Sequence, residues 1–183
     1  MIKFILSCLY FFLPAYFTNM TPPLAKKIGV LKSLDKPVDS NKTLNGKPIL
    51  GSHKTWRGVV SGMIVGISFV YFQAWLYQFP QIQGYCILNY EKIDLLLFAL
   101  LISGGAIFGD LTSAFFKRRL ALKPGAKFLP FDQTNYVIGS AIFLTCFLEI
   151  DILVWITLFI STFFLHIIFN RLGFHLKFHK AKW

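Results

Sequence analysis

The sequence predicts an all-α integral membrane protein with about five transmembrane helices and two long polar loops. Of its 183 residues, 55% are hydrophobic and only 15% are charged, and the mean hydropathy is +0.59. A soluble domain usually carries about a quarter charged residues, so this chain has too little polar surface to fold in water. The apolar residues fall into separate runs long enough for membrane helices, which also excludes a disordered chain.

Five apolar runs are the predicted spans of a single membrane domain. They are residues 2–18, 59–79, 93–109, 136–148 and 152–170. The first is expected to stay attached as a helix kinked at Pro14, because too few residues separate Lys3 from Cys8 for a cleavable signal. The fourth is short, and Glu149 and Asp151 lie between it and the fifth, which predicts a tight helical hairpin.

The basic residues predict how these spans are oriented. Nearly all of the 19 Lys and Arg residues lie in the loop 19–57, the loop 110–135 and the C-terminal tail. By the positive-inside rule these three segments are cytoplasmic and the N-terminus is outside, an alternation that five spans require. Topology therefore explains the net charge of +11, and we expect a cytoplasmic-membrane protein that binds no nucleic acid.

Two of the predicted spans carry glycine at every fourth position. These are Gly58, Gly62 and Gly66 at the start of the second, and Gly105 and Gly109 at the end of the third. Small residues at this spacing let helix backbones approach closely in a bilayer. We expect the two helices to pack on each other, or one of them on the partner subunit of a homodimer. The first arrangement would draw Arg57 and Asp110 together.

The second predicted loop has a carboxylate at each end. Asp110 directly follows an apolar run and Asp132 precedes the fourth span, with Lys117, Arg118 and Arg119 between them. Two carboxylates at membrane boundaries, flanking a basic cluster, favour a site that holds a hard cation such as Mg²⁺ beside phosphates. The 3 cysteines are far apart and do not have the spacing of zinc ligands.

The first predicted loop ends in a polar stretch, GSHKTWRG at residues 51–58. Its hydroxyls, Lys54 and Arg57 are suited to contact a polyphosphate, although the stretch lacks the glycine spacing and strand of a P-loop. The alternative is that the basic residues only anchor the chain to anionic lipid. Asp110 and Asp132 argue against that alternative, because an anchoring surface has no use for boundary carboxylates beyond pairing with arginine.

Together these motifs resemble the CDP-archaeol synthase family, which belongs with the CTP:phosphatidate cytidylyltransferases. The resemblance rests on residues 51–58, on GDLTSAFFKRRLALKPG at residues 109–125 and on Phe131-Asp132-Gln133, and it covers nearly the whole chain in order. It implies a Mg²⁺-dependent transferase of phospholipid biosynthesis. Such a nucleotidyltransferase moves CMP from CTP to a lipid phosphate, which gives a CDP-activated lipid and pyrophosphate.

The resemblance also implies roles for individual residues. Asp110 and Asp132 would be the metal ligands and, with Lys117, the catalytic residues. The substrate contacts would be Lys54, Thr55, Arg57, Arg118, Arg119, Asn19, Asp35, Gln133 and Asn135. Family members often carry an acidic residue at the position of Asn135, whose amide oxygen still coordinates Mg²⁺ but brings no charge.

Some alternatives stay open at the level of sequence. Arg118 and Arg119 are also compatible with snorkelling to lipid headgroups, and Asp35 with capping a turn. A CDP-alcohol phosphotransferase would use a related nucleotide, but its several-aspartate motif is missing. A small transporter or an assembly scaffold is the non-enzymatic alternative, and either would be expected to place polar residues at mid-membrane. The lipid tails can be ester-linked or ether-linked.

Overall fold

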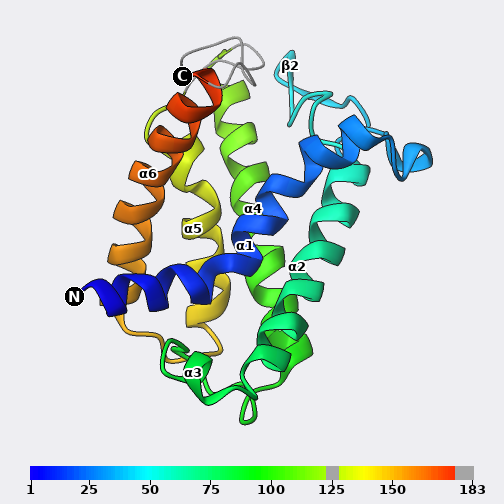
Figure 1. Cartoon of the computed structure of the whole chain (residues 1–183). Helices are drawn as coiled ribbons and strands as arrows, with labels where there is room; N and C mark the ends of the chain where they lie inside the picture. Colours follow the sequence, from blue (N-terminus) through cyan, green and yellow to red (C-terminus); the bar gives the residue numbers. More distant parts are fainter. Residues whose placement is uncertain (123–127, 176–183) are drawn as a thin grey trace.

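The computed structural model describes residues 1–122 and 128–175 as a helical bundle with a small polar region at one end (Figure 1). Its helices are α1 (Ile2–Ile28), α2 (Trp56–Leu76), the short α3 (Pro80–Gln83), α4 (Leu95–Arg119), α5 (Phe131–Thr145) and α6 (Ile152–His175). Between α1 and α2 lie a 3₁₀ turn, η1 (Lys32–Leu34), and a two-stranded antiparallel ladder of β1 (Thr43–Leu44) and β2 (Lys47–Pro48). The predicted all-α class is confirmed apart from this ladder.

The helices identify a membrane protein by length and composition. In the described part of the chain, α1, α2 and α4 are long and apolar enough to cross a bilayer, and α6 contributes the shorter apolar stretch Ile152–Ile168. The predicted fourth span, residues 136–148, overlaps α5, which begins five residues earlier and ends at Thr145. With 15 residues α5 is shorter than the roughly 20 that a perpendicular span needs. The count of five spans, with the N-terminus outside, stays a prediction.

An aromatic core joins four of the helices. Cys8, Phe11, Phe12 and Ala15 are buried on one face of α1, as a helical period of 3.6 residues requires. The ring centroids of Phe11 and Phe12 lie 6.0 and 6.3 Å from that of Trp155 in α6. Phe11 also contacts α4, and Phe12 contacts α5. Because α1 crosses obliquely in front of α4 and α5, its polar C-terminal end reaches the top of α2 (Figure 1).

Three helices extend beyond the predicted spans, which corrects the loop boundaries 19–57 and 110–135. α1 continues to Ile28 and ends where Gly29 adopts a left-handed conformation with φ 79°, and α4 continues to Arg119. α5 already begins at Phe131. The physical reason is that leaving the bilayer does not end a helix, since Lys and Arg are good helix formers. Asp110 and Asp132 therefore lie on helices rather than in a loop.

The two glycine-rich helices do pack on each other, as expected, and Gly66 of α2 lies against Ser103 of α4, but most of their glycines face other helices. Gly105 and Gly109 of α4 lie against the backbone of α5, where a Cβ on Gly105 would sit 2.6 Å from the Cα of Ser140. Gly58 and Gly62 of α2 face α1, and at Gly62 the nearest atom is the carbonyl oxygen of Thr18. The glycine face of α4 thus packs on α5, whereas that of α2 packs mainly on α1. A homodimer stays a prediction.

Candidate active site

The polar end of the bundle is built on the segment between α1 and α2, which Asp39 organises. Its carboxylate accepts hydrogen bonds from the backbone N–H groups of Asn41, Leu50 and Gly51, at 3.0, 2.8 and 2.9 Å. Burial alone would raise the pKa of Asp39, but these hydrogen bonds outweigh it and hold the pKa below its ordinary value. The segment is thereby folded back so that the residues after Gly51 face α4.

Arg119 fixes the same segment to the end of α4. Its guanidinium donates to the carbonyl oxygens of Leu44 and Lys47, at 2.6 and 3.1 Å, and also to that of Pro48. In return, Lys47 Nζ donates to the Arg119 carbonyl oxygen at 3.0 Å. Arg119 was predicted to contact substrate, but here its charged end is used to hold protein carbonyls.

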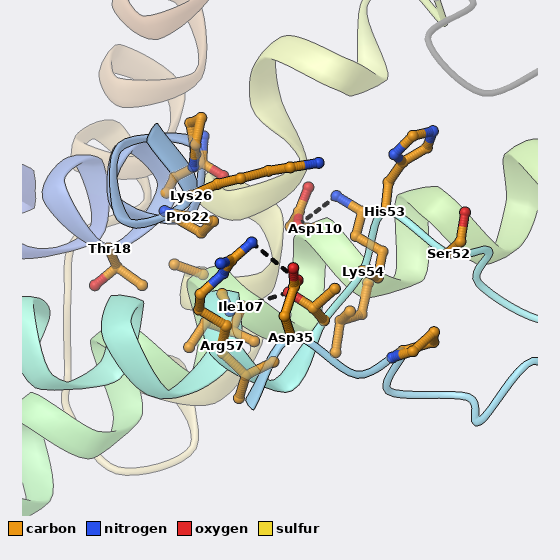
Figure 2. Close-up of a pocket in the computed structure, with 18 residues that line it drawn as sticks. Thr18, Pro22, Lys26, Asp35, Ser52, His53, Lys54, Arg57, Ile107 and Asp110 are labelled. Carbon is orange, nitrogen blue, oxygen red and sulfur yellow. Dashed lines mark hydrogen bonds and ion pairs between the residues drawn. The ribbon is translucent and has the colours of Figure 1, made fainter. Parts of the chain in front are cut away.

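A first cavity, which we call the Arg57 cavity, has a volume of about 610 Å³ and lies between α1, α2 and α4 (Figure 2). Among the predicted site residues it is lined by Asn19, Asp35, Lys54, Thr55, Arg57 and Asp110. The hydroxyl of Thr55 caps α2 by accepting from the Gly58 N–H at 3.4 Å. This cap places the buried Arg57 in the first turn of α2, where it forms an ion pair with Asp35 at 2.9 Å.

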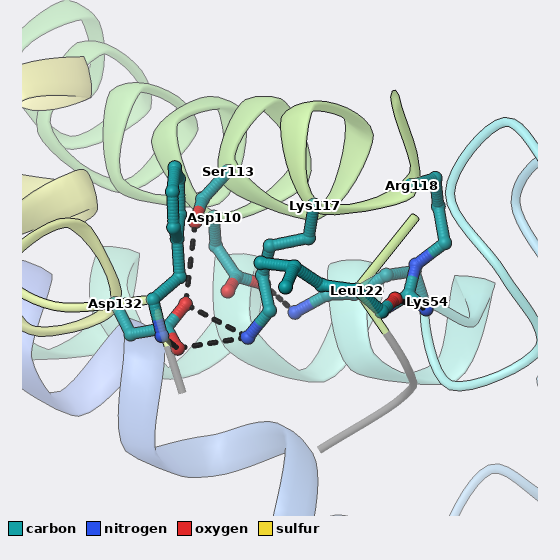
Figure 3. Close-up of polar contacts among 8 residues, drawn as sticks. Lys54, Asp110, Ser113, Lys117, Arg118, Leu122 and Asp132 are labelled. Atoms are coloured by element: carbon teal, nitrogen blue, oxygen red, sulfur yellow. Dashed lines mark hydrogen bonds and ion pairs between the residues drawn. The ribbon is translucent and has the colours of Figure 1, made fainter. Parts of the chain in front are cut away.

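A second cavity, the Asp132 cavity, has a volume of about 390 Å³ and adjoins the first (Figure 3). Lys117 Nζ lies 3.1 and 2.8 Å from the two carboxylate oxygens of Asp132. Ser113 Oγ and the Phe128 backbone N–H also donate to this carboxylate, at 3.4 and 3.0 Å. Asp132 of α5 is therefore bound to two side chains of α4.

The wall common to both cavities is the pair formed by Lys54 and Asp110. Lys54 Nζ lies 2.6 Å from Asp110 Oδ2, and these two residues and His53 line both cavities. Arg57 and Asp110, which were expected to approach each other, both line the Arg57 cavity, but each is paired with another residue, Asp35 and Lys54 respectively. One connected polar space thus runs from α1 to α5, with the Lys54–Asp110 pair at its centre.

The donor set of this space fits Mg²⁺. No group of three His, Cys, Asp or Glu residues gathers anywhere in residues 1–122 or 128–175. Mg²⁺ does not need one, since it is usually held by one or two carboxylates together with water and substrate phosphates. Asp110 and Asp132 line the same cavity as Lys54, Lys117 and Arg118, whose cationic groups are of the kind that binds phosphate.

Three predicted substrate contacts lie outside these two cavities. Gln133 is buried, and its Oε1 has no hydrogen-bond partner among the described residues. Asn135 is also buried and lines a third, apolar cavity between α4 and α5, as does Arg119. The predicted direct contacts of these three side chains with a polar ligand therefore have no support in their positions.

Four residues at the site were not predicted from the sequence: Lys26, Asp39, His53 and Ser113. For Lys26 and Ser113, the spacing along a helix could have indicated a place at the site. Once α1 and α4 are extended, Lys26 follows Asn19 by two helical turns, and Ser113 lies between Asp110 and Lys117 at the i, i+3, i+7 spacing of one helix face. Asp39 gave no signal, because all three of its partners are backbone groups.

Comparison with known proteins finds both similar sequences and a similar fold. The family model described as CarS-like, CDP-archaeol synthase, matches residues 1–183. A CDP-archaeol synthase of Methanosarcina mazei is 32% identical over 93% of this chain and 99% of its own length, and one of Pyrococcus furiosus is 30% identical over 98% of both. A solved intramembrane enzyme for archaeal membrane lipids biosynthesis has a TM-score of 0.69 at 24% identity, covering 88% of this chain and 91% of its own.

Proposed function

The chain belongs to the CDP-archaeol synthase family, and on this premise we propose that it transfers CMP from CTP to the phosphate of a membrane lipid. An oxygen of the lipid phosphate attacks the α-phosphorus of CTP, and the bond from that phosphorus to the bridging oxygen breaks. The products are a CDP-activated lipid and pyrophosphate. The substrate class that the family favours is an archaeal lipid phosphate.

The reaction mainly requires the protein to bring two anions together. The acceptor phosphate is already ionised, so no general base is needed and the barrier arises largely from repulsion and orientation. Lys54, Lys117 and Arg118 line one cavity and supply positive charge where the two phosphates would meet. Arg57 is buried against the neighbouring cavity and offers a guanidinium fork to a second phosphate group.

The two lysine–carboxylate pairs carry this proposal. In the structure each carboxylate is neutralised by a lysine, at 2.6 Å in one pair and 2.8 Å in the other. When substrates bind, both lysines can exchange a carboxylate oxygen for a phosphate oxygen, which leaves Asp110 and Asp132 available as metal ligands. Asp110 and Asp132 would then hold Mg²⁺, which would supply positive charge against the negative charge of the reacting phosphates.

Family membership also decides between the alternative functions, and the charge of the loops indicates how the protein is oriented in the membrane. Family membership favours cytidylyl transfer over a CDP-alcohol phosphotransferase, a transporter or a scaffold. The cavities lie at the end of the bundle where the basic 29–55 segment packs on α2 and α4. By the positive-inside rule that end would face the cytoplasm, and the enzyme would bind CTP from that side.

The test is to incubate the purified protein with labelled CTP and Mg²⁺ in the presence of a panel of lipid phosphates. The panel should contain ester-linked and ether-linked chains, and the product should be identified as a CDP-lipid together with released pyrophosphate. We expect product with at least one long-chain lipid phosphate and more with an ether-linked isoprenoid one. Absence of a CDP-lipid with every member of the panel, in protein that remains folded, would overturn the proposal.

A further inference from the structure

Pro14 interrupts the backbone hydrogen bonding of α1 inside the bundle. It has no backbone N–H, so the carbonyl oxygen of Tyr10, one turn earlier, has no partner within the helix. Pro14 is buried, and a carbonyl group without a partner away from water is destabilising. The helix nevertheless continues to Ile28. A partner for the Tyr10 carbonyl must therefore come from another element.

That partner is Gln73 of α2. Its Nε2 donates to the Tyr10 carbonyl oxygen at 2.5 Å, and the Tyr90 hydroxyl donates to Gln73 Oε1 at 3.3 Å. Gln73 is 1% exposed and Tyr90 is 4% exposed, so both side chains are buried. A buried amide in an apolar helix is destabilising unless it is hydrogen-bonded. The carbonyl that Pro14 leaves without a helical partner therefore explains why a glutamine lies at this position.

Gln73 lies too far from the polar site to contact a substrate there. Along α2 it is about 24 Å from Arg57 at 1.5 Å per residue, and it lines none of the three cavities. Its hydrogen bond reaches α1 instead, and α1 extends from the Tyr10 carbonyl to the Arg57 cavity. Any effect of Gln73 on the polar site must therefore pass through α1.

The part of α1 beyond Pro14 forms one wall of the Arg57 cavity. Thr18, Asn19 and Lys26 line this wall, and α1 changes direction as it crosses the bundle (Figure 1). Lys26 is about 18 Å along the helix from Pro14, so a change of about 10° in the kink would move Lys26 by about 3 Å. A displacement of that size is enough to break a hydrogen bond to a phosphate group.

We propose that Gln73 is a positioning residue, which holds the kink of α1 at Pro14 and thereby places the α1 wall of the Arg57 cavity for substrate. This inference rests on the proposed function and adds to it a residue near the other end of α2. Lys26, Lys54 and Arg57 line the cavity, and three cations suit the triphosphate of CTP, so CTP binding is the readout. The alternative is that Gln73 contributes to stability alone.

A double-variant analysis with Pro14→Ala tests this role. Gln73→Leu should lower the thermal stability and raise the Kd for labelled CTP about fivefold, because the kink is no longer held. Pro14→Ala supplies the N–H that the Tyr10 carbonyl lacks, so adding Gln73→Leu to it should change neither quantity further. The matched control is Ser140→Ala, which removes a buried bond of the same kind, 2.9 Å from Ser140 Oγ to the Ile102 carbonyl oxygen. It should lower stability equally with and without Pro14→Ala and leave the Kd for CTP unchanged.

A second variant keeps the test independent of how well the others fold. Tyr90→Phe removes the donor to Gln73 Oε1 and should raise the Kd for CTP about twofold, with no further effect in Gln73→Leu. An unchanged Kd in both Tyr90→Phe and folded Gln73→Leu, or equal effects of Gln73→Leu with and without Pro14, would overturn the inference. CTP binding without any CDP-lipid product from the unmodified protein would overturn only the proposed function, whereas failure of the unmodified protein to bind CTP would overturn both.

Discussion

The two carboxylates of the site are held in different ways. Asp132 accepts from Lys117, Ser113 and the Phe128 backbone, so both of its oxygens are bound where α4 packs on α5. Asp110 lies on α4 as well, but within the residues that the structure describes its one hydrogen-bond and ion-pair partner is Lys54. Lys54 comes from the segment between α1 and α2 rather than from a neighbouring helix.

This difference separates a fixed side of the site from an adjustable one. The groups around Asp132 are set by the helix contact between α4 and α5, which tight glycine packing makes rigid. The partner of Asp110 is set by the 29–55 segment, which Asp39 and Arg119 hold in place through backbone hydrogen bonds. Substrate binding can therefore move Lys54 at lower cost than it can move Lys117 or Asp132.

The largest expected effect is loss of CMP transfer in Asp110→Asn and Asp132→Asn. Each variant should reduce turnover roughly 100-fold or more, because each removes a charged metal ligand, and EDTA should do the same to the unmodified protein. Because Asp132 has more hydrogen-bond partners than Asp110, the two variants should differ in thermal stability in detergent. Asp132→Asn weakens several charge-assisted hydrogen bonds and should cost about 1–3 kcal/mol, whereas Asp110→Asn should cost less.

Equal stability of the two variants would mean that the two carboxylates are held alike. Full turnover in either variant would remove that residue from the catalytic site.

The next prediction concerns the rigid side and uses adjacent glycines of α4. A Cβ on Gly105 would lie 2.6 Å from the Cα of Ser140, whereas one on Gly104 would lie 3.7 Å from the Cε of Met63. Gly105→Ala should force α4 and α5 apart, cost about 1–3 kcal/mol and lower turnover by separating Lys117 from Asp132. Gly104→Ala should be neutral or slightly stabilising, since alanine is the better helix former. Thermal unfolding and turnover of the pair check this, and similar behaviour of both variants would contradict the close α4–α5 contact.

The fixed and the adjustable side of the site also differ in how much of their structure could be predicted from the sequence. Composition and apolar runs were enough for a helical membrane protein, and the spacing of Asp110 and Lys117 was enough to bring a carboxylate and a cation to one site. The partner of each glycine face was not predictable, because several helices offered compatible surfaces and only the folded bundle selects α5 for Gly105. Asp39 was missed because hydrogen bonds to backbone N–H groups leave no pairwise pattern in the side chains.

The adjustable side gives a third prediction, for Asp39→Asn. An amide cannot replace both oxygens that accept from Asn41, Leu50 and Gly51, so the segment carrying Lys54 should loosen and the KM for CTP should rise roughly tenfold. Because hydrogen bonding lowers the pKa of Asp39 in the folded protein, its contribution is present above the unfolded pKa of about 3.9 and is lost only as the pH falls through the lower folded value. The rise in KM should therefore be the same at all pH values from about 6 to 8.

Asp94→Asn is the matched control for this variant. Asp94 caps the far end of α4 by accepting from the Leu97 N–H, and asparagine is an equally good cap. A KM for CTP in Asp39→Asn that stays equal to that of Asp94→Asn would show that the segment does not depend on this carboxylate.

The smallest expected effect distinguishes substrate binding from membrane anchoring at the end of α1. Lys26 and Lys27 are adjacent and exposed, but only Lys26 lines the Arg57 cavity, and Figure 2 shows it extending toward the side where Lys54 and Asp110 lie. If CTP occupies that cavity, Lys26→Ala removes one exposed charge from a phosphate contact, and the KM for CTP should rise about three- to tenfold. Lys27→Ala should leave it unchanged, and both should be measured in neutral detergent so that no anionic lipid contributes. Equal effects would assign both lysines to anchoring and would leave the Arg57 cavity without a cation from α1, so that Lys54 and Arg57 alone would have to bind the triphosphate.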